Sequence, residues 1–125
     1  MGDSRLPPLP GGHVERLLTT SPEDVPAEYV AALARFCAGA VDVERGYVCA
    51  VKIERADGES MQRLTFCVKL VAPVSEPHDS RETAEALFAR LSQSQPDLAR
   101  RLGFGVMADR AVAAWEANAL RVYPR

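Results

Sequence analysis

The hydrophobic residues follow a helical period in the first third of the chain. Between residues 25 and 36 they recur at steps of three and four, which predicts an amphipathic helix that buries one stripe. The stripe consists of Val25, Tyr29, Ala32, Leu33 and Phe36. Ser21 and Pro22, followed by two carboxylates, are typical of a helix N-terminus, and Gly39 favours an end soon after the stripe.

The period changes to two from Gly46, which predicts two strands joined as a hairpin. Apolar residues alternate with other side chains in both segments, and Asp57-Gly58 between them favours a tight turn. The alternating sets are Tyr47, Cys49, Val51 and Ile53 in the first strand and Leu64, Phe66, Val68 and Leu70 in the second. Because the two apolar faces should coincide, we expect Val51 near Phe66 and Ile53 near Leu64. Cys49 and Cys67 then lie on opposite faces, which disfavours a disulfide between them.

The second half of the chain predicts two more helices and further extended segments. Ser80 begins a helix whose buried face consists of Ala84, Leu87, Phe88 and Leu91. Pro96 interrupts this pattern, and the residues after it suggest a short separate turn that ends at Gly103. Residues 104–108 are expected to form a third strand. Asp109 caps a short helix that carries Val112, Trp115 and Ala119. Residues 13–18 and 120–123 are both compatible with a short strand.

The order of the main elements, α-β-β-α-β-α, predicts the α+β fold class. We expect a small antiparallel or mixed sheet of three to four strands with two to three helices packed on one face. A length of 125 residues fits one domain. Residues 1–20 are interpreted as a Pro/Gly-rich N-terminal tail, in preference to a polyproline peptide that docks on another protein, and residues 21–125 as a single α+β domain.

Charge and hydropathy argue against two classes of partner. The 15 basic and 17 acidic residues give a net charge of -2 and are spread along the chain, whereas nucleic-acid binding needs a concentrated basic face. No apolar run reaches the length of about 18 residues that a transmembrane helix needs. The N-terminus also lacks the apolar segment of a secretory signal. We therefore expect a cytoplasmic protein that binds neither nucleic acid nor membrane.

The residues that could carry chemistry form no recognisable constellation. Cys37, Cys49 and Cys67 lack the CxxC spacing of a zinc site, and both histidines lie apart from them. The sequence His78-Asp79-Ser80 is better explained by helix capping than by a catalytic triad. Gly103-Phe104-Gly105 precedes a strand, whereas a phosphate cradle precedes a helix. We therefore predict no catalytic residue, no cofactor and no metal, and hence no enzyme activity.

Three short motifs, taken in order, resemble the C-terminal domain of the SseB family of bacterial proteins, which is named for an enhanced-serine-sensitivity phenotype. Residues 26–33, PAEYVAAL, look like the family's opening P-x-x-L-x-x-x-L helix, and residues 43–48, VERGYV, look like its V-x-x-A-Y-L strand. Residues 120–125, LRVYPR, are similar to its closing P-F-Y-x-R. The resemblance covers residues 22–125 and implies an α+β domain to which no catalytic residue can be transferred.

These observations together predict a protein-interaction or regulatory module. We expect it to meet a protein partner, or a second copy of itself, through a sheet face or an edge strand such as residues 120–123. The candidate contact residues are the aromatic side chains Tyr47, Phe104, Trp115 and Tyr123. The alternative is a small-molecule sensor or minor enzyme with a pocket between the second helix and the sheet, near Tyr47, Phe88 and Trp115. A chaperone-like adaptor is a third option, which no particular residue supports.

Overall fold

The computed structural model describes residues 14–55 and 57–124 and shows a mixed α+β domain. Within these residues the chain forms five strands and four α-helices. The strands are β1 (Val14–Leu18), β2 (Val43–Glu54), β3 (Ser60–Leu70), β4 (Gly103–Val106) and β5 (Leu120–Tyr123). The helices are α1 (Ala27–Ala38), α2 (Arg81–Ser94), α3 (Pro96–Arg101) and α4 (Val112–Asn118). The α+β class is confirmed, but the numbers and order of elements differ from the prediction because both short end segments are strands and the segment after Pro96 is a separate helix.

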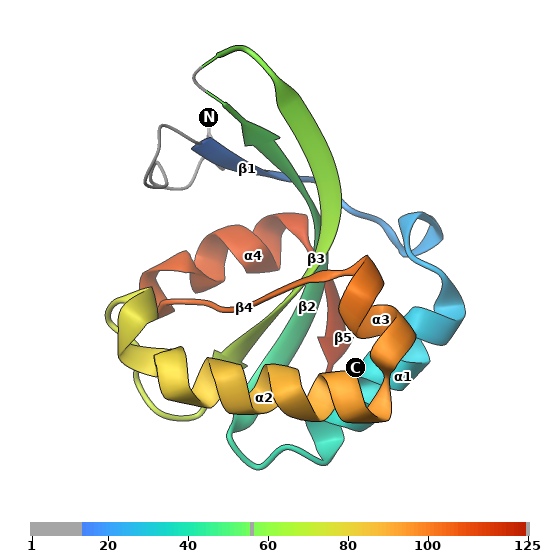
Figure 1. Ribbon diagram of the computed structural model, residues 1–125, viewed down its shortest axis with the longest axis vertical. Helices are drawn as coiled ribbons and strands as arrows, with labels where there is room; N and C mark the ends of the chain where they lie inside the picture. The colour runs from blue at the N-terminus through green and yellow to red at the C-terminus, as the bar shows by residue number, and fades with distance from the viewer. Residues whose placement is uncertain (1–13, 56, 125) are drawn as a thin grey trace.

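A long antiparallel hairpin, β2–β3, forms the centre of the sheet (Figure 1). Along the outer side of β2, β5 pairs with residues 46–48 and β1 pairs with residues 50–54, both antiparallel. Along the outer side of β3, β4 pairs in parallel with residues 65–68, after a crossover through α2 and α3. Because β1 belongs to the sheet, the domain begins before residue 21, where composition had placed its boundary. The rest of the predicted tail, residues 1–13, lies outside the described residues.

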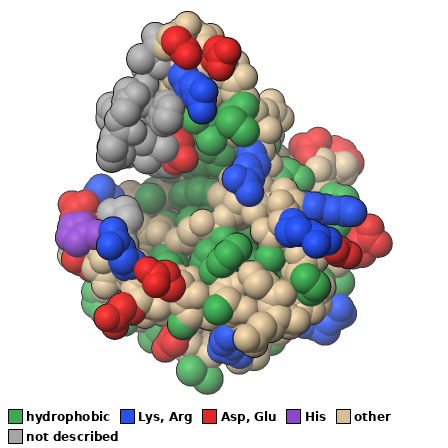
Figure 2. Space-filling model, viewed as in Figure 1, with side chains coloured by type: hydrophobic (Ala, Val, Ile, Leu, Met, Phe, Trp, Pro, Cys, Tyr) green, Lys and Arg blue, Asp and Glu red, His purple; other side chains and the backbone are tan. Residues whose placement is uncertain are grey.

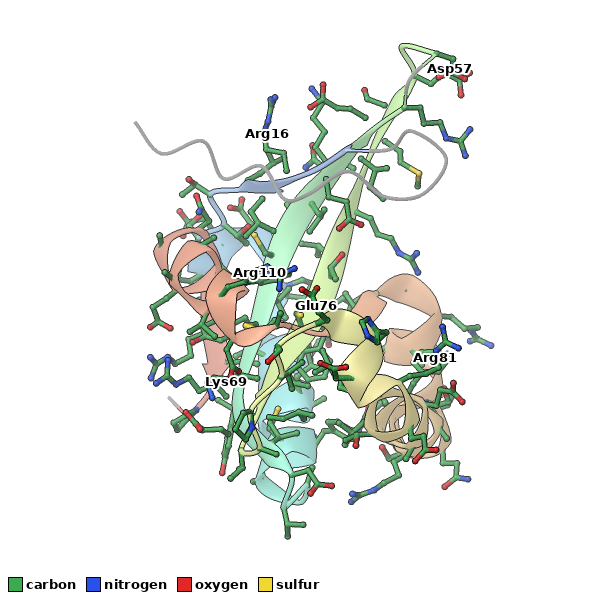
Figure 3. All side chains as sticks on the ribbon, turned by 90° about the vertical axis from the view of Figure 1, so that its left-hand side faces the viewer. Arg16, Asp57, Lys69, Glu76, Arg81 and Arg110 are labelled. Atoms are coloured by element: carbon green, nitrogen blue, oxygen red, sulfur yellow. The ribbon has the colours of Figure 1, made fainter. Side chains whose placement is uncertain are left out.

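Helices cover both faces of the sheet, not one face as predicted (Figure 3). The first core lies between one face and helices α1, α2 and α3, and it includes Val48 and Phe66 of the hairpin. The second core lies between the other face and α4, and it includes Tyr47, Cys49 and Trp115. The prediction was wrong because consecutive residues of β2 are apolar. Tyr47, Val48 and Cys49 are each 0% exposed, and successive side chains of a strand point to opposite faces.

The register of the hairpin differs from the predicted one by three residues. Val51 lies opposite Arg63, not Phe66, and Phe66 lies opposite Val48. The argument from coinciding apolar faces failed because both faces of β2 are buried, so burial alone does not select one register. As a result, Cys49 and Cys67 share the second core instead of lying on opposite faces, and both are free thiols.

Gly46 permits close contact between α1 and the sheet. A Cβ atom at this position would lie 2.7 Å from Sγ of Cys37 and 3.2 Å from Cε1 of Phe66. Any larger residue would therefore force the helix and the strand apart. The close approach lets Cys37 of α1 and Phe66 of β3 pack over Gly46 in the first core.

Candidate interaction edge of the sheet

The four aromatic residues predicted to contact a partner do not gather on one surface. Tyr47 and Trp115 lie in the second core, where they are 0% and 4% exposed. Phe104 and Tyr123 are partly buried against the first core. Tyr47 and Trp115 therefore stabilise the fold, and only Phe104 and Tyr123 retain exposed surface.

The hydroxyl of Tyr47 is used inside the domain. It donates a short hydrogen bond to Oε2 of Glu116 on α4, and Arg121 of β5 donates another to Oε1 of the same carboxylate. Burial and the bond to Glu116 raise the pKa of Tyr47, while the bonds from Tyr47 and Arg121 lower the pKa of Glu116. The carboxylate thus links α4 to two strands, which explains the polar group of Tyr47 without an external ligand.

None of the cysteines has the environment of a nucleophile. All three are buried, and burial raises the pKa of Cys37 to about 12 and also raises the pKa values of Cys49 and Cys67. A reactive cysteine needs the opposite shift, because the thiolate is the attacking species. His78 is exposed, and its Nε2 lies 3.3 Å from a carboxylate oxygen of Asp79. The thiols and the histidine therefore belong to different environments.

The described residues offer neither a cluster of metal ligands nor a membrane-spanning helix. Among residues 14–55 and 57–124, no three His, Cys, Asp or Glu side chains lie together in a way that could hold a metal ion. In the same part of the chain, no helix combines the length and the apolar character needed to cross a bilayer.

The pocket expected near Tyr47, Phe88 and Trp115 cannot form from these residues, because they lie on opposite faces of the sheet. The ring centroid of Phe88 lies 6.0 Å from that of Phe104. The ring centroid of Phe104 lies 5.6 Å from that of Phe66 in the first core. A depression of about 470 Å³ instead lies beside the hairpin, with Leu18, Ala50 and Leu64 among its walls.

The outer edge of β3 is only half covered. Strand β4 pairs with residues 65–68, and no strand in the described part of the chain pairs with the outer side of residues 60–64. We call the outer side of residues 60–64 the free edge. In Figure 1 the upper part of β3 rises above α3, and no described strand runs along its outer side. At its lower end the free edge stops where β4 begins, and Arg63 donates a hydrogen bond of 3.2 Å to the carbonyl of Leu102 there.

The direction of the backbone groups along β3 follows from two hydrogen bonds. The amide of Arg55 donates to the carbonyl of Glu59 across the hairpin at 2.8 Å, so Glu59 directs its carbonyl toward β2. From the other side of β3, the amide of Met107 donates to the carbonyl of Val68 at 3.0 Å, so Val68 directs its carbonyl away from β2. Because the two directions alternate along an antiparallel strand, Ser60 and Gln62 direct their N–H and C=O groups to the free edge, and Met61 and Arg63 direct theirs to β2.

The side chains along the free edge give it little protection against another strand. Edge strands are commonly blocked by proline, by a bulge or by charged side chains, and Arg63 is the one charged residue among residues 60–64. Residues 60–64 contain no proline, and the only irregularity in the pairing of β2 with β3 lies at the far end, between Val43 and Arg45. Residues 60–63 are exposed, and Met61 is 51% exposed. Figure 2 shows acidic side chains at the tip of this projecting hairpin, with basic and hydrophobic side chains below them.

Comparison of the chain with protein-family models, with curated proteins and with solved structures gave no match. The resemblance to the SseB family therefore stays a prediction. Sequence reasoning also missed the free edge, because the alternation of residues 60–64 is the same whether or not a neighbouring strand covers them. A signal was present only in the polarity of Ser60, Gln62 and Arg63, which is unusual for a strand covered on both sides.

Proposed function

We propose that this chain is a cytoplasmic, non-catalytic interaction module that binds an extended protein segment by strand addition at the free edge. The observation that carries the proposal is a strand of the central hairpin whose outward backbone groups have no strand partner within the described residues. Main-chain hydrogen bonds from Ser60 and Gln62 would supply affinity without regard to sequence. A regulatory role would follow from the identity of the segment bound.

The surroundings of the free edge could supply specificity. Side chains of an added strand would point alternately to the two faces of the sheet. On the face of the first core, they would meet the depression of about 470 Å³, whose walls include Gln62 and Leu64. On the opposite face they would meet Met61 and Arg63. An apolar side chain on the first face and an acidic one on the second would therefore suit this edge.

The test uses a proline that blocks only the outward direction. Because the amide of Gln62 faces the free edge, Gln62→Pro removes a donor for an added strand and leaves the bonds to β2 in place. Peptides selected from a random library against the wild-type protein should bind the proline variant at least about tenfold more weakly, the loss expected when one strand-pairing donor is replaced by a clash. The control variant Gln62→Ala changes the side chain and keeps the amide, so it should bind like the wild type. Equal binding by all three proteins would rule out strand addition at this edge.

A further inference from the structure

We infer that the free edge pairs with the free edge of a second copy of this chain, antiparallel about a twofold axis that passes beside Met61. This inference rests on the proposed function, since it names the strand that is added. It requires the two free edges to complement each other in backbone direction, in length and in charge.

Backbone direction limits the register. Residues whose N–H and C=O groups face outward must lie opposite residues that also face outward. Ser60 and Gln62 face outward, so Ser60 can lie opposite Gln62 of the second copy, with Met61 opposite its own counterpart. In this arrangement each pair of outward residues exchanges two hydrogen bonds. The two Met61 residues form a pair without hydrogen bonds, in which the side chains approach most closely.

The length of the free edge favours the same register. With the axis beside Met61, the turn of the second copy lies opposite Leu64, just before the first residue of β3 that pairs with β4. Moving the axis to Gln62 places Glu59 of the second copy opposite Thr65, whose outer side is already occupied by Gly103. Moving it to Arg63 places two guanidinium groups opposite each other, and like charges in this position are destabilising.

Charge is complementary in the Met61 register. Glu59, Met61 and Arg63 alternate with Ser60 and Gln62, so these three side chains project to one face. Arg63 of each copy then lies opposite Glu59 of the other, on both sides of the central methionine pair. The side chain of Glu59 is 73% exposed and forms an ion pair of 3.6 Å with Arg55 at the same exposed turn. Opposite charges directly across an antiparallel pair are favourable, and here symmetry provides two such pairs.

The inferred interface is small and should be weak. A short strand pair with one apolar contact falls below the area of about 1,200 Å² that marks stable complexes. Association is therefore expected to be reversible and visible only at high protein concentration, from about 10 µM to about 1 mM.

Charge reversal across the interface tests the inference directly. Sedimentation equilibrium of the full chain should show that Glu59→Arg and Arg63→Glu each weaken association by at least about tenfold, because each replaces two attractive pairs with two repulsive ones. The double variant Glu59→Arg/Arg63→Glu restores opposite charges and should recover most of the association. Lys52→Glu, on the same hairpin but on β2, is the matched control and should associate like the wild type.

Cross-linking tests the register. Met61→Cys should form a symmetric disulfide-linked dimer on mild oxidation, whereas Gln62→Cys should not, because Gln62 lies opposite Ser60 of the second copy. The three native thiols are buried, so the wild-type protein should form little disulfide-linked dimer under the same conditions. Preferential cross-linking through residue 62 would overturn the Met61 register.

The outcomes separate this inference from the proposed function. A protein that stays monomeric at about 1 mM, or that dimerises equally well with either charge reversed, would overturn self-pairing. Peptides that still bind such a protein, and that lose affinity with Gln62→Pro, would leave strand addition standing. If the protein neither self-associates nor binds peptides in a way that Gln62→Pro weakens, the free edge is not a binding site.

Discussion

The two outer sides of the central hairpin are completed differently. Along β2, two strands from opposite ends of the chain lie end to end and cover residues 46–48 and 50–54. Along β3, β4 covers only residues 65–68, because the chain leaves α3 at Arg101 and enters β4 two residues later. The lower half of the hairpin is therefore enclosed by strands and by helices on both faces, while the upper half projects. Buried apolar side chains are concentrated in the enclosed half, and the free edge lies in the other.

The largest expected effect is the difference in thiol reactivity between the native and the denatured protein. All three cysteines are buried in the cores, and a thiol whose pKa is about 12, like that of Cys37, carries roughly a thousandth of the thiolate of an ordinary cysteine near pH 8. Because burial raises these pKa values, reactivity should increase only as the pH rises toward them or as the protein unfolds. Ellman's reagent should detect almost no fast-reacting thiol in the native protein and all three in denaturant. One rapid native thiol would show that a core opens easily.

Core truncation should separate the two halves by stability. Phe66 is 0% exposed and packs against the rings of Phe36 and Phe104, so Phe66→Ala should lower the free energy of unfolding by about 3–5 kcal/mol. Met61→Ala, on the projecting half, should cost less than about 1 kcal/mol because the side chain is 51% exposed. Urea denaturation followed by circular dichroism gives both values. Comparable losses would mean that the projecting half contributes as much as the enclosed half.

Two glycines of the hairpin should respond to alanine for different reasons. Gly46→Ala introduces a Cβ atom 2.7 Å from Sγ of Cys37, and such overpacking costs about 1–3 kcal/mol. Gly58 has a φ of 92° with open space around it, so Gly58→Ala meets no neighbour and costs about 1 kcal/mol of backbone strain. Thermal unfolding of the two variants should therefore rank Gly46→Ala as the less stable. The reverse order would contradict the close approach of α1 to β2.

The smallest expected effect tests the direction of the backbone along β3. Met61 directs its amide to β2, so Met61→Pro should destabilise the protein by about 1 kcal/mol more than Gln62→Pro, which removes an amide that faces outward. Hydrogen exchange of the wild-type monomer should agree, with slow exchange at Met61 and fast exchange at Gln62. Fast exchange at both positions would instead show that the upper hairpin frays as a whole.

The sequence predicted where helices and strands form better than it predicted which of them pack against one another. The helix whose buried stripe includes Leu33 and Phe36 was confirmed as α1, and the two long strands were confirmed as β2 and β3, although their burial does not alternate. The register and the placement of α4 were not predicted, because Tyr47, Val48 and Cys49 bury both faces of β2 and so carry no signal of which face meets which helix. The free edge was missed for a related reason. Pairing on the outer side of β3 depends on how far β4, a distant part of the chain, extends along it.

By itself, the sequence determined periodicity and breaks: where helices and strands form, where Gly58 turns the chain, and that one α+β domain results. These features depend on interactions between residues a few positions apart, which the order of amino acids specifies directly. Only the tertiary structure decided that α4 closes a second core and that β4 stops short of residues 60–64. Those outcomes depend on packing and chain length over long separations, and the same local pattern is compatible with a covered or an uncovered edge.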